Sequence, residues 1–128
     1  MDRITESEIR KAVVTYADTM AKTDPNYSML VGIPNEGRRS FFYGRKLKDE
    51  GLRAGFPDTF LFVPRGLFLG AAIEFKRPGG VLSEKQRYWI GKLTDQGYLV
   101  ALIDSVEAGI RFLDWYISGA IIDEAPIH

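Results

Sequence analysis

The sequence predicts an α/β fold in which a mixed central β-sheet is flanked by helices. Two observations support this fold class. Patterns typical of helices and strands alternate along the chain, in the order helix, strand, short helix, two strands, helix, strand, helix. The two adjacent strands form a hairpin and are antiparallel, whereas the last strand follows a crossover helix and therefore runs parallel to its partner.

Length and composition fit one globular domain. The chain has 128 residues, of which 45% are hydrophobic and 27% charged, as in proteins with a buried core. We expect one domain over residues 1–128, with a loosely held tail over residues 118–128. The chain has no cysteine, which excludes disulfides, thiolate metal sites and cysteine nucleophiles. No apolar run approaches the ~20 residues of a membrane span, so we expect a cytoplasmic protein with neither a membrane partner nor an organic cofactor.

The first half of the chain predicts a helix, a strand and a short helix. Thr5 or Ser7 can cap a helix that runs to about Lys22. A strand is expected over residues 27–33 and a short helix over residues 40–50, because turn residues separate these segments. The apolar residues at helical spacing in the first helix are Ile9, Val13, Tyr16, Ala17 and Met20.

The second half predicts a hairpin, two helices and a final strand. Apolar runs over residues 58–63 and 69–76 read as the two strands of the hairpin. Ser83 caps a helix to about Gln96, a strand covers residues 98–103, and a last helix covers residues 105–117. The residues expected to face inward from the helix after Ser83 are Trp89, Ile90 and Leu93.

The hairpin carries three charged residues that suggest chemistry. Residues two apart in a strand share a face, so Glu74 and Lys76 project together from a segment too apolar for a surface strand. Asp58 opens the neighbouring strand, which brings its carboxylate near Glu74. Two close carboxylates repel each other unless a cation lies between them. The pattern therefore indicates a metal site.

Oxygen ligands favour a hard divalent cation. The carboxylates of Asp58 and Glu74, with the carbonyl of Phe75, suit Mg²⁺ or Mn²⁺. Such an ion lowers the pKa of bound water and stabilises charge on a phosphoryl oxygen. Lys76 can then orient or help deprotonate that water, or stabilise the phosphorane. This set has the parts for hydrolysis of a phosphodiester.

An ordinary hairpin is the competing interpretation, because an aspartate followed by Glu-x-Lys is a short and frequent pattern. Three features of this chain favour the metal site. Gly55 and Pro57 stand before Asp58, both strands are hydrophobic, and a Pro-Gly-Gly turn follows the lysine segment.

Several motifs together resemble the virus-type replication-repair nuclease domain, VRR-NUC, of the PD-(D/E)xK nuclease superfamily. The resemblance covers about residues 6–113. Its motifs are IPNEG at 33–37, LKDEGL at 47–52, GFPD at 55–58, IEFKRPGG at 73–80, Leu82-Ser83, Gln86 and Gln96-Gly97-Tyr98.

The resemblance implies a restriction-endonuclease-like core and cleavage of DNA that depends on Mg²⁺ or Mn²⁺. Asp58 and Glu74 match the metal ligands of the family, and Lys76 matches its catalytic lysine. Gln86 matches the glutamine that supports the active site from the following helix.

The family also takes a glutamate from the first helix, and both Glu6 and Glu8 are available. Glu6 lies three residues before Ile9 and seven before Val13, so it shares their inward face, whereas Glu8 points away. We therefore expect Glu6 to be the metal-site carboxylate. The alternative is that Glu6 only interacts with the helix dipole.

Positive charge is concentrated in two segments around the candidate site. Residues 36–53 hold six basic and three acidic residues, and residues 76–92 hold five basic and one acidic. The net charge of the chain is nevertheless zero, which argues against binding by bulk charge alone. The residues expected to contact DNA phosphates are Arg38, Arg39, Arg45, Lys46 and Arg77.

The predicted function is a structure-selective DNA endonuclease, which we expect in the cytoplasm of a bacterial or phage-infected cell. Stand-alone members of the family resemble Holliday-junction resolvases, and a chain this short has little room to build a groove for branched DNA alone. We therefore expect a homodimer that cuts four-way junctions. The alternatives are a monomeric flap or fork nuclease, and a non-catalytic DNA-binding module on the same fold.

Overall fold

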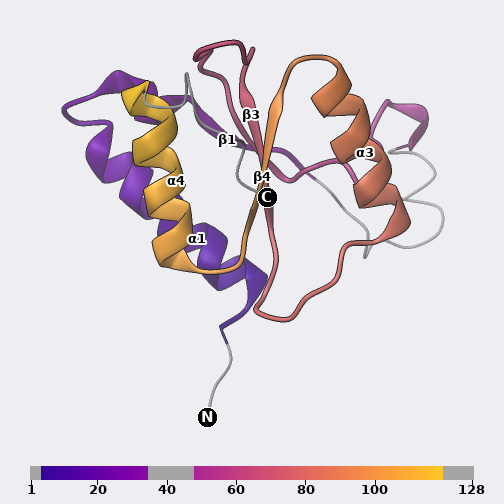
Figure 1. Ribbon diagram of the computed structural model, residues 1–128. Coiled ribbons are helices and arrows are strands. Elements are labelled where there is room, and N and C mark those ends of the chain that lie inside the picture. The colour runs from indigo at the N-terminus through magenta and orange to yellow at the C-terminus, as the bar shows by residue number, and fades with distance from the viewer. Residues whose placement is uncertain (1–3, 35–47, 120–128) are drawn as a thin grey trace.

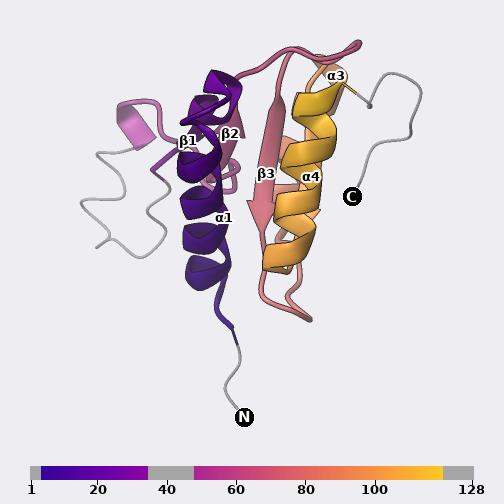
Figure 2. The ribbon, with the colours of Figure 1, turned by 90° about the vertical axis from the view of Figure 1, so that its left-hand side faces the viewer.

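In the computed structural model, which describes residues 4–34 and 48–119, a central sheet lies between two helical layers. Helices α1 and α4 cover one face of the sheet and α3 covers the other (Figure 1). Viewed from the side of α1 and α4, these two helices lie next to each other in front of the strands (Figure 2). The helices are α1 (Glu6–Met20), the 3₁₀-helix η1 (Pro25–Met29), α3 (Glu84–Asp95) and α4 (Val106–Ser118).

The sheet is mixed, as predicted. The strands are β1 (Leu30–Gly32), β2 (Thr59–Leu61), β3 (Ala71–Phe75) and β4 (Leu99–Ile103), in the spatial order β1-β2-β3-β4. β2 is antiparallel to both β1 and β3, whereas β4 is parallel to β3. The parallel pair needs a crossover connection, and α3 supplies it.

Polar side chains fix the starts of the helices at the positions that the sequence predicts. Thr5 forms a capping box with Glu8 before α1, and Ser83 forms one with Gln86 before α3. Before α4, the side chain of Ser105 accepts a hydrogen bond from the backbone of Ala108.

The alternation of side chains along the strands divides the core into two clusters. The larger cluster lies under α1 and α4 and includes Ile73 and Phe75 of β3. The predicted inward stripe of α1 is confirmed, because Ile9, Val13 and Ala17 are fully buried there. The smaller cluster, under α3, is formed by the buried residues Phe60, Ala72, Leu93 and Val100.

The prediction for residues 27–33 is wrong in its first half. The side chain of Asp24 accepts a hydrogen bond from the backbone N–H of Asn26, and Pro25 begins η1 in place of a strand. Tyr27 is buried, and its hydroxyl donates to Asp114 on α4 at 2.7 Å. Tertiary contacts therefore override the strand pattern, and only Leu30–Gly32 pairs with β2.

The expected short helix over residues 40–50 lies mostly outside the described residues, and so does most of the expected tail. Lys48 and Asp49 are helical. On α3, Leu93 is buried as expected, whereas Trp89 and Ile90 are only partly buried. In the described part of the chain, no helix is long and apolar enough to cross a membrane.

Gly109 sets how closely α4 approaches α1. A Cβ atom at this position would lie 2.5 Å from Cγ2 of Val13, whose β-branched side chain has little rotamer freedom in a helix. We expect Gly109→Ala to lower the free energy of unfolding by about 1–3 kcal/mol through overpacking. Chemical denaturation measures this change.

The matched control is Gly91→Ala on α3, where an added Cβ meets nothing within 4 Å. Alanine is the better helix former, so this variant should gain about 0.5–1 kcal/mol. Equal effects of the two substitutions would contradict the packing argument.

Candidate active site

The predicted chemical residues meet at one end of the sheet. β3 ends there and, because β2 and β3 are antiparallel, β2 begins there. The first turn of α1 lies toward the same end, below the arrowhead of β3 in Figure 2. The site therefore lies where two strand ends approach the beginnings of α1 and α3.

The register of β2 and β3 places Asp58 across from Glu74. Thr59 pairs with Ile73, and the same register carried one residue further sets Asp58 opposite Glu74. Residues directly opposite in antiparallel strands have Cβ atoms about 4.5–5.5 Å apart and share a face of the sheet. Asp58 and Glu74 thus form a carboxylate pair by backbone pairing alone.

Glu74 is a buried acid. Its side chain is only 4% exposed. Burial raises the pKa of Glu74 to about 8, and the nearby charge of Asp58 adds to the rise, while Lys76 opposes it. A carboxyl group in this environment gains strongly from any cation that enters beside it.

Asp58 is held by hydrogen bonds at both carboxylate oxygens. Oδ1 accepts from the hydroxyl of Thr59 at 3.1 Å, and Oδ2 accepts from the guanidinium of Arg10 at 2.9 Å. Burial raises the pKa of Asp58, whereas the charge of Arg10 lowers it. These two contacts fix the orientation of the Asp58 carboxylate without a ligand.

Gln86 has two roles because its amide has two ends. Oε1 accepts from the backbone N–H of Ser83 at 2.8 Å and completes the capping box of α3. This leaves Nε2 to donate to Oε2 of Glu74, at 3.0 Å. The first turn of α3 is thereby attached to the buried acid.

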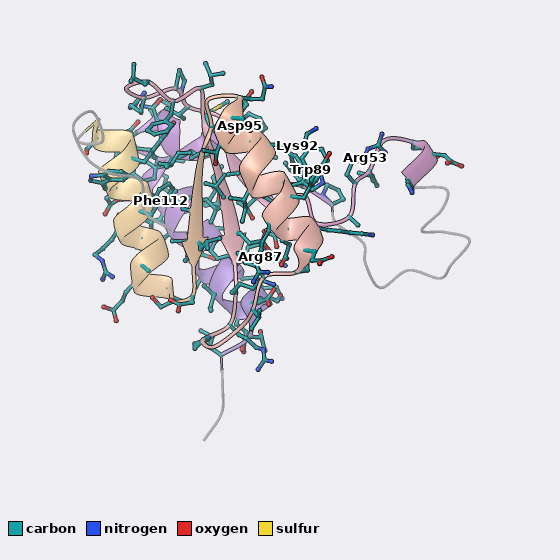
Figure 3. All side chains as sticks on the ribbon, turned by 45° about the vertical axis from the view of Figure 1, so that its right-hand side comes forward. Arg53, Arg87, Trp89, Lys92, Asp95 and Phe112 are labelled. Atoms are coloured by element: carbon teal, nitrogen blue, oxygen red, sulfur yellow. The ribbon has the colours of Figure 1, made fainter. Side chains whose placement is uncertain are left out.

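The loop before Asp58 packs against α3. Gly55 has φ +84°, and a Cβ there would lie 2.6 Å from the backbone of Lys85, so only glycine allows this approach. One residue further, Phe56 makes an edge-to-face contact with Trp89 at 5.1 Å. Trp89 projects from α3 toward the segment that begins at Arg53 (Figure 3). The glycine and the aromatic contact together position Asp58.

Lys76 lies directly after β3 and is partly buried. Its backbone N–H donates to Ile103 and continues the pairing with β4. The Pro78-Gly79 turn then reverses the chain, since Gly79 has φ +80° and Gly80 donates to the carbonyl of Arg77 at 2.8 Å. The turn brings Gly80 against the aliphatic stem of Lys76.

The remaining candidate residues differ in their surroundings. Glu6 is partly buried on α1, and its charge contributes to the raised pKa of both Asp58 and Glu74, so it lies within electrostatic range of the pair. Glu8 serves the capping box with Thr5. The side chain of Phe75 is in the core on the opposite face, which leaves its carbonyl as the group that could bind a metal.

Of the residues predicted to contact DNA, Arg77 is exposed in the turn after Lys76. The predicted DNA contacts outside the described residues are Arg38, Arg39, Arg45 and Lys46.

The donor set fits a hard divalent cation. It consists of the carboxylates of Asp58 and Glu74, of which the first raises the pKa of the second, and the backbone carbonyl of Phe75, with the charge of Glu6 acting on both acids. Within residues 4–34 and 48–119, no three side chains of His, Asp or Glu form a group that could hold a metal ion, so Glu6 does not complete a three-carboxylate site with Asp58 and Glu74. The site is thus an open carboxylate pair with Arg10 as its present counter-charge.

The sequence predictions missed Arg10 and Thr59. Arg10 lies four residues after Glu6, so the helical periodicity that selected Glu6 also places Arg10 on the same side of α1. That signal was present in the sequence. Thr59 gives no such signal, because a threonine in a buried strand is ordinary and its bond to Asp58 depends on the rotamer.

The raised pKa of Glu74 predicts how pH affects the stability of the protein in a chelating buffer. Because the pKa of Glu74 is higher in the folded protein than in the unfolded chain, protonated Glu74 stabilises the fold. This contribution to the free energy of unfolding is fully present below pH 4.5 and is lost as the pH rises toward about 8. Relative to Glu74→Gln, the wild type should lose on the order of a few kcal/mol over this window. Denaturation of both proteins at several pH values measures the difference. A difference that does not change with pH would mean that Glu74 is ionised in the folded protein.

Comparisons with known proteins identify the family and the fold. The family model described as the VRR-NUC domain matches residues 3–107. A solved structure described as a "VRR_NUC domain protein" has the same fold, with a TM-score of 0.78 and 24% sequence identity, over 91% of each chain. A search of curated proteins gave no match. The match to the family model covers most of the chain, and the solved structure confirms the predicted fold class. The chain belongs to the VRR-NUC family, a family of nucleases of the PD-(D/E)xK type.

Proposed function

We propose that Asp58, Glu74, Lys76 and Gln86 form the active site of a DNA endonuclease that depends on Mg²⁺ or Mn²⁺. The carboxylate pair carries this proposal, because the sheet register sets Asp58 opposite Glu74 and buries the glutamate at a cost that a cation removes. A hairpin with only a structural role would gain nothing from burying a carboxyl group. Glu6 is proposed as a further carboxylate of the site, because its charge acts on both Asp58 and Glu74.

Each residue of the set has a distinct task. Asp58, Glu74 and the carbonyl of Phe75 would hold the cation, which supplies an acidified water and charge stabilisation at a phosphoryl oxygen. Gln86 holds Oε2 of Glu74 and so directs the other oxygen of this carboxylate. Lys76 follows Glu74 on the same side of the chain, where its ammonium can orient the attacking water or accept developing negative charge.

The proposed substrate is a four-way DNA junction, cut by a homodimer. Two active sites related by a twofold axis match the symmetry of a junction whose opposite strands are cut. Arg77, exposed directly beyond Lys76, is placed to contact a phosphate near the cut. Arg38, Arg39, Arg45 and Lys46 are proposed to extend this contact surface.

Cleavage assays test the active site. Purified protein is incubated with labelled four-way junction, flap and linear duplex, in Mg²⁺, Mn²⁺ or chelator. We expect paired symmetric nicks in the junction, and none in chelator. Asp58→Ala, Glu74→Ala and Lys76→Ala should each lower the cleavage rate by on the order of 100-fold or more, with junction binding retained.

Lys22→Ala is the matched control, because Lys22 is an exposed lysine just beyond the other end of α1. It should cut like the wild type. No cleavage of any substrate by the folded protein with either metal would refute the enzyme. Nicks confined to the flap, by a protein that sediments as a monomer, would instead favour the flap nuclease.

Gln86 allows a test of how Glu74 is held. Gln86→Glu keeps the capping box, in which glutamate is an equally good partner, but removes the amide that donates to Glu74. We expect cleavage to fall by roughly tenfold or more, since the loss of a charge-assisted hydrogen bond, which contributes about 1.5–3 kcal/mol, is added to the repulsion between two close carboxylates. Unchanged cleavage would show that the hydrogen bond is not needed for activity.

A further inference from the structure

We propose that Arg10 is the resident counter-cation of Asp58 and competes with the divalent cation for oxygen Oδ2, so that Arg10 sets the metal affinity of the site. This inference rests on the proposed function, because it presumes that Asp58 is a metal ligand. Arg10 is then a positioning residue, because it acts through Asp58.

The contact between Arg10 and Asp58 is direct and partly shielded from water. Nη1 of Arg10 lies 2.9 Å from Oδ2, with the two side chains 33% and 20% exposed. Ion pairs at this depth are screened less than surface pairs. Since Oδ1 already accepts from Thr59, Oδ2 is the oxygen that a new cation must share with the guanidinium.

Arg10 acts on both carboxylates of the pair. Its charge lowers the pKa of Glu74 as well as that of Asp58. The field that stabilises two negative charges at this point also repels a second positive charge placed between them. An arginine cannot relieve this repulsion by losing its proton. It must therefore move away from Oδ2 or weaken the binding of the incoming ion.

The position of Arg10 makes such a movement possible. It lies one helical turn after Glu6, near the start of α1, and a third of its side chain is already exposed. The stem of an arginine can turn its head group toward water without disturbing the helix. Arg10 thus orients Asp58 while no metal is bound and releases it on loading.

Metal binding by the intact protein tests the inference without any activity measurement. Mn²⁺ is titrated into wild type and Arg10→Gln, and the free ion is measured by electron paramagnetic resonance. We expect Arg10→Gln to bind Mn²⁺ about tenfold more tightly, because the ion no longer has to displace one charge-assisted contact at Asp58. Arg10→Lys, which keeps the charge but not the planar fork, should fall between the two.

Arg87→Gln is the control for general electrostatics. Arg87 is exposed on the first half of α3 (Figure 3), and its replacement deletes the same charge without removing the ion pair between Arg10 and Asp58. This variant should bind Mn²⁺ like the wild type. Circular dichroism verifies that each variant is folded, and Arg10→Met replaces Arg10→Gln if the latter unfolds.

The outcomes separate the inference from the proposed function. Equal or weaker Mn²⁺ binding by the folded Arg10 variants would overturn the inference and leave the metal site intact. An equal gain in Arg87→Gln would overturn it as well, because bulk charge would then explain the effect. No Mn²⁺ binding by any of the proteins would overturn the metal site and the inference together.

Discussion

The candidate site depends on the register between β2 and β3. Side chains alternate along a strand, so a slip of one residue would turn every side chain of β2 to the other face of the sheet. Asp58 would then face the cluster under α1 and α4, away from Glu74. The residues that fix the register are the buried apolar ones, Phe60 and Leu61, each committed to one core cluster. The hydrophobic core thus determines where the acids lie.

The two faces of the sheet serve different purposes. The face under α1 and α4 holds the larger core cluster and is stabilised by packing, and a polar contact adds to it where Tyr16 and Tyr27 both donate to Asp114. The face under α3 holds a smaller cluster and, at its end, the buried acid Glu74. The larger cluster can offset the cost of burying a carboxyl group on the opposite face.

The sequence predicted α1, α3 and α4, the mixed sheet and the pairing of Asp58 with Glu74, since these follow from periodicity and from the alternation of side chains. It did not predict η1, because the hydrogen bond from Tyr27 to Asp114 joins residues 87 positions apart. Helical periodicity places Arg10 on the same side of α1 as Glu6, but its ion pair with Asp58 joins residues 48 positions apart and requires the fold. Gly55 belongs to the motif before Asp58, but the reason that this position needs glycine, its close approach to the backbone of Lys85, follows only from the fold.

The contribution of α1 to the site has a consequence for the order of assembly. The hydrogen bond between Gln86 and Glu74 joins residues 12 positions apart, whereas Arg10 on α1 and Asp58 are 48 positions apart. Contacts between distant segments close late in folding, because the entropy of the intervening loops must be overcome first. A partly folded chain can therefore form the hairpin and attach Gln86 to Glu74 while Asp58 still lacks its partner Arg10. Docking of α1 is thus also a safeguard, since the candidate site gains its full set of residues only when the whole domain has formed.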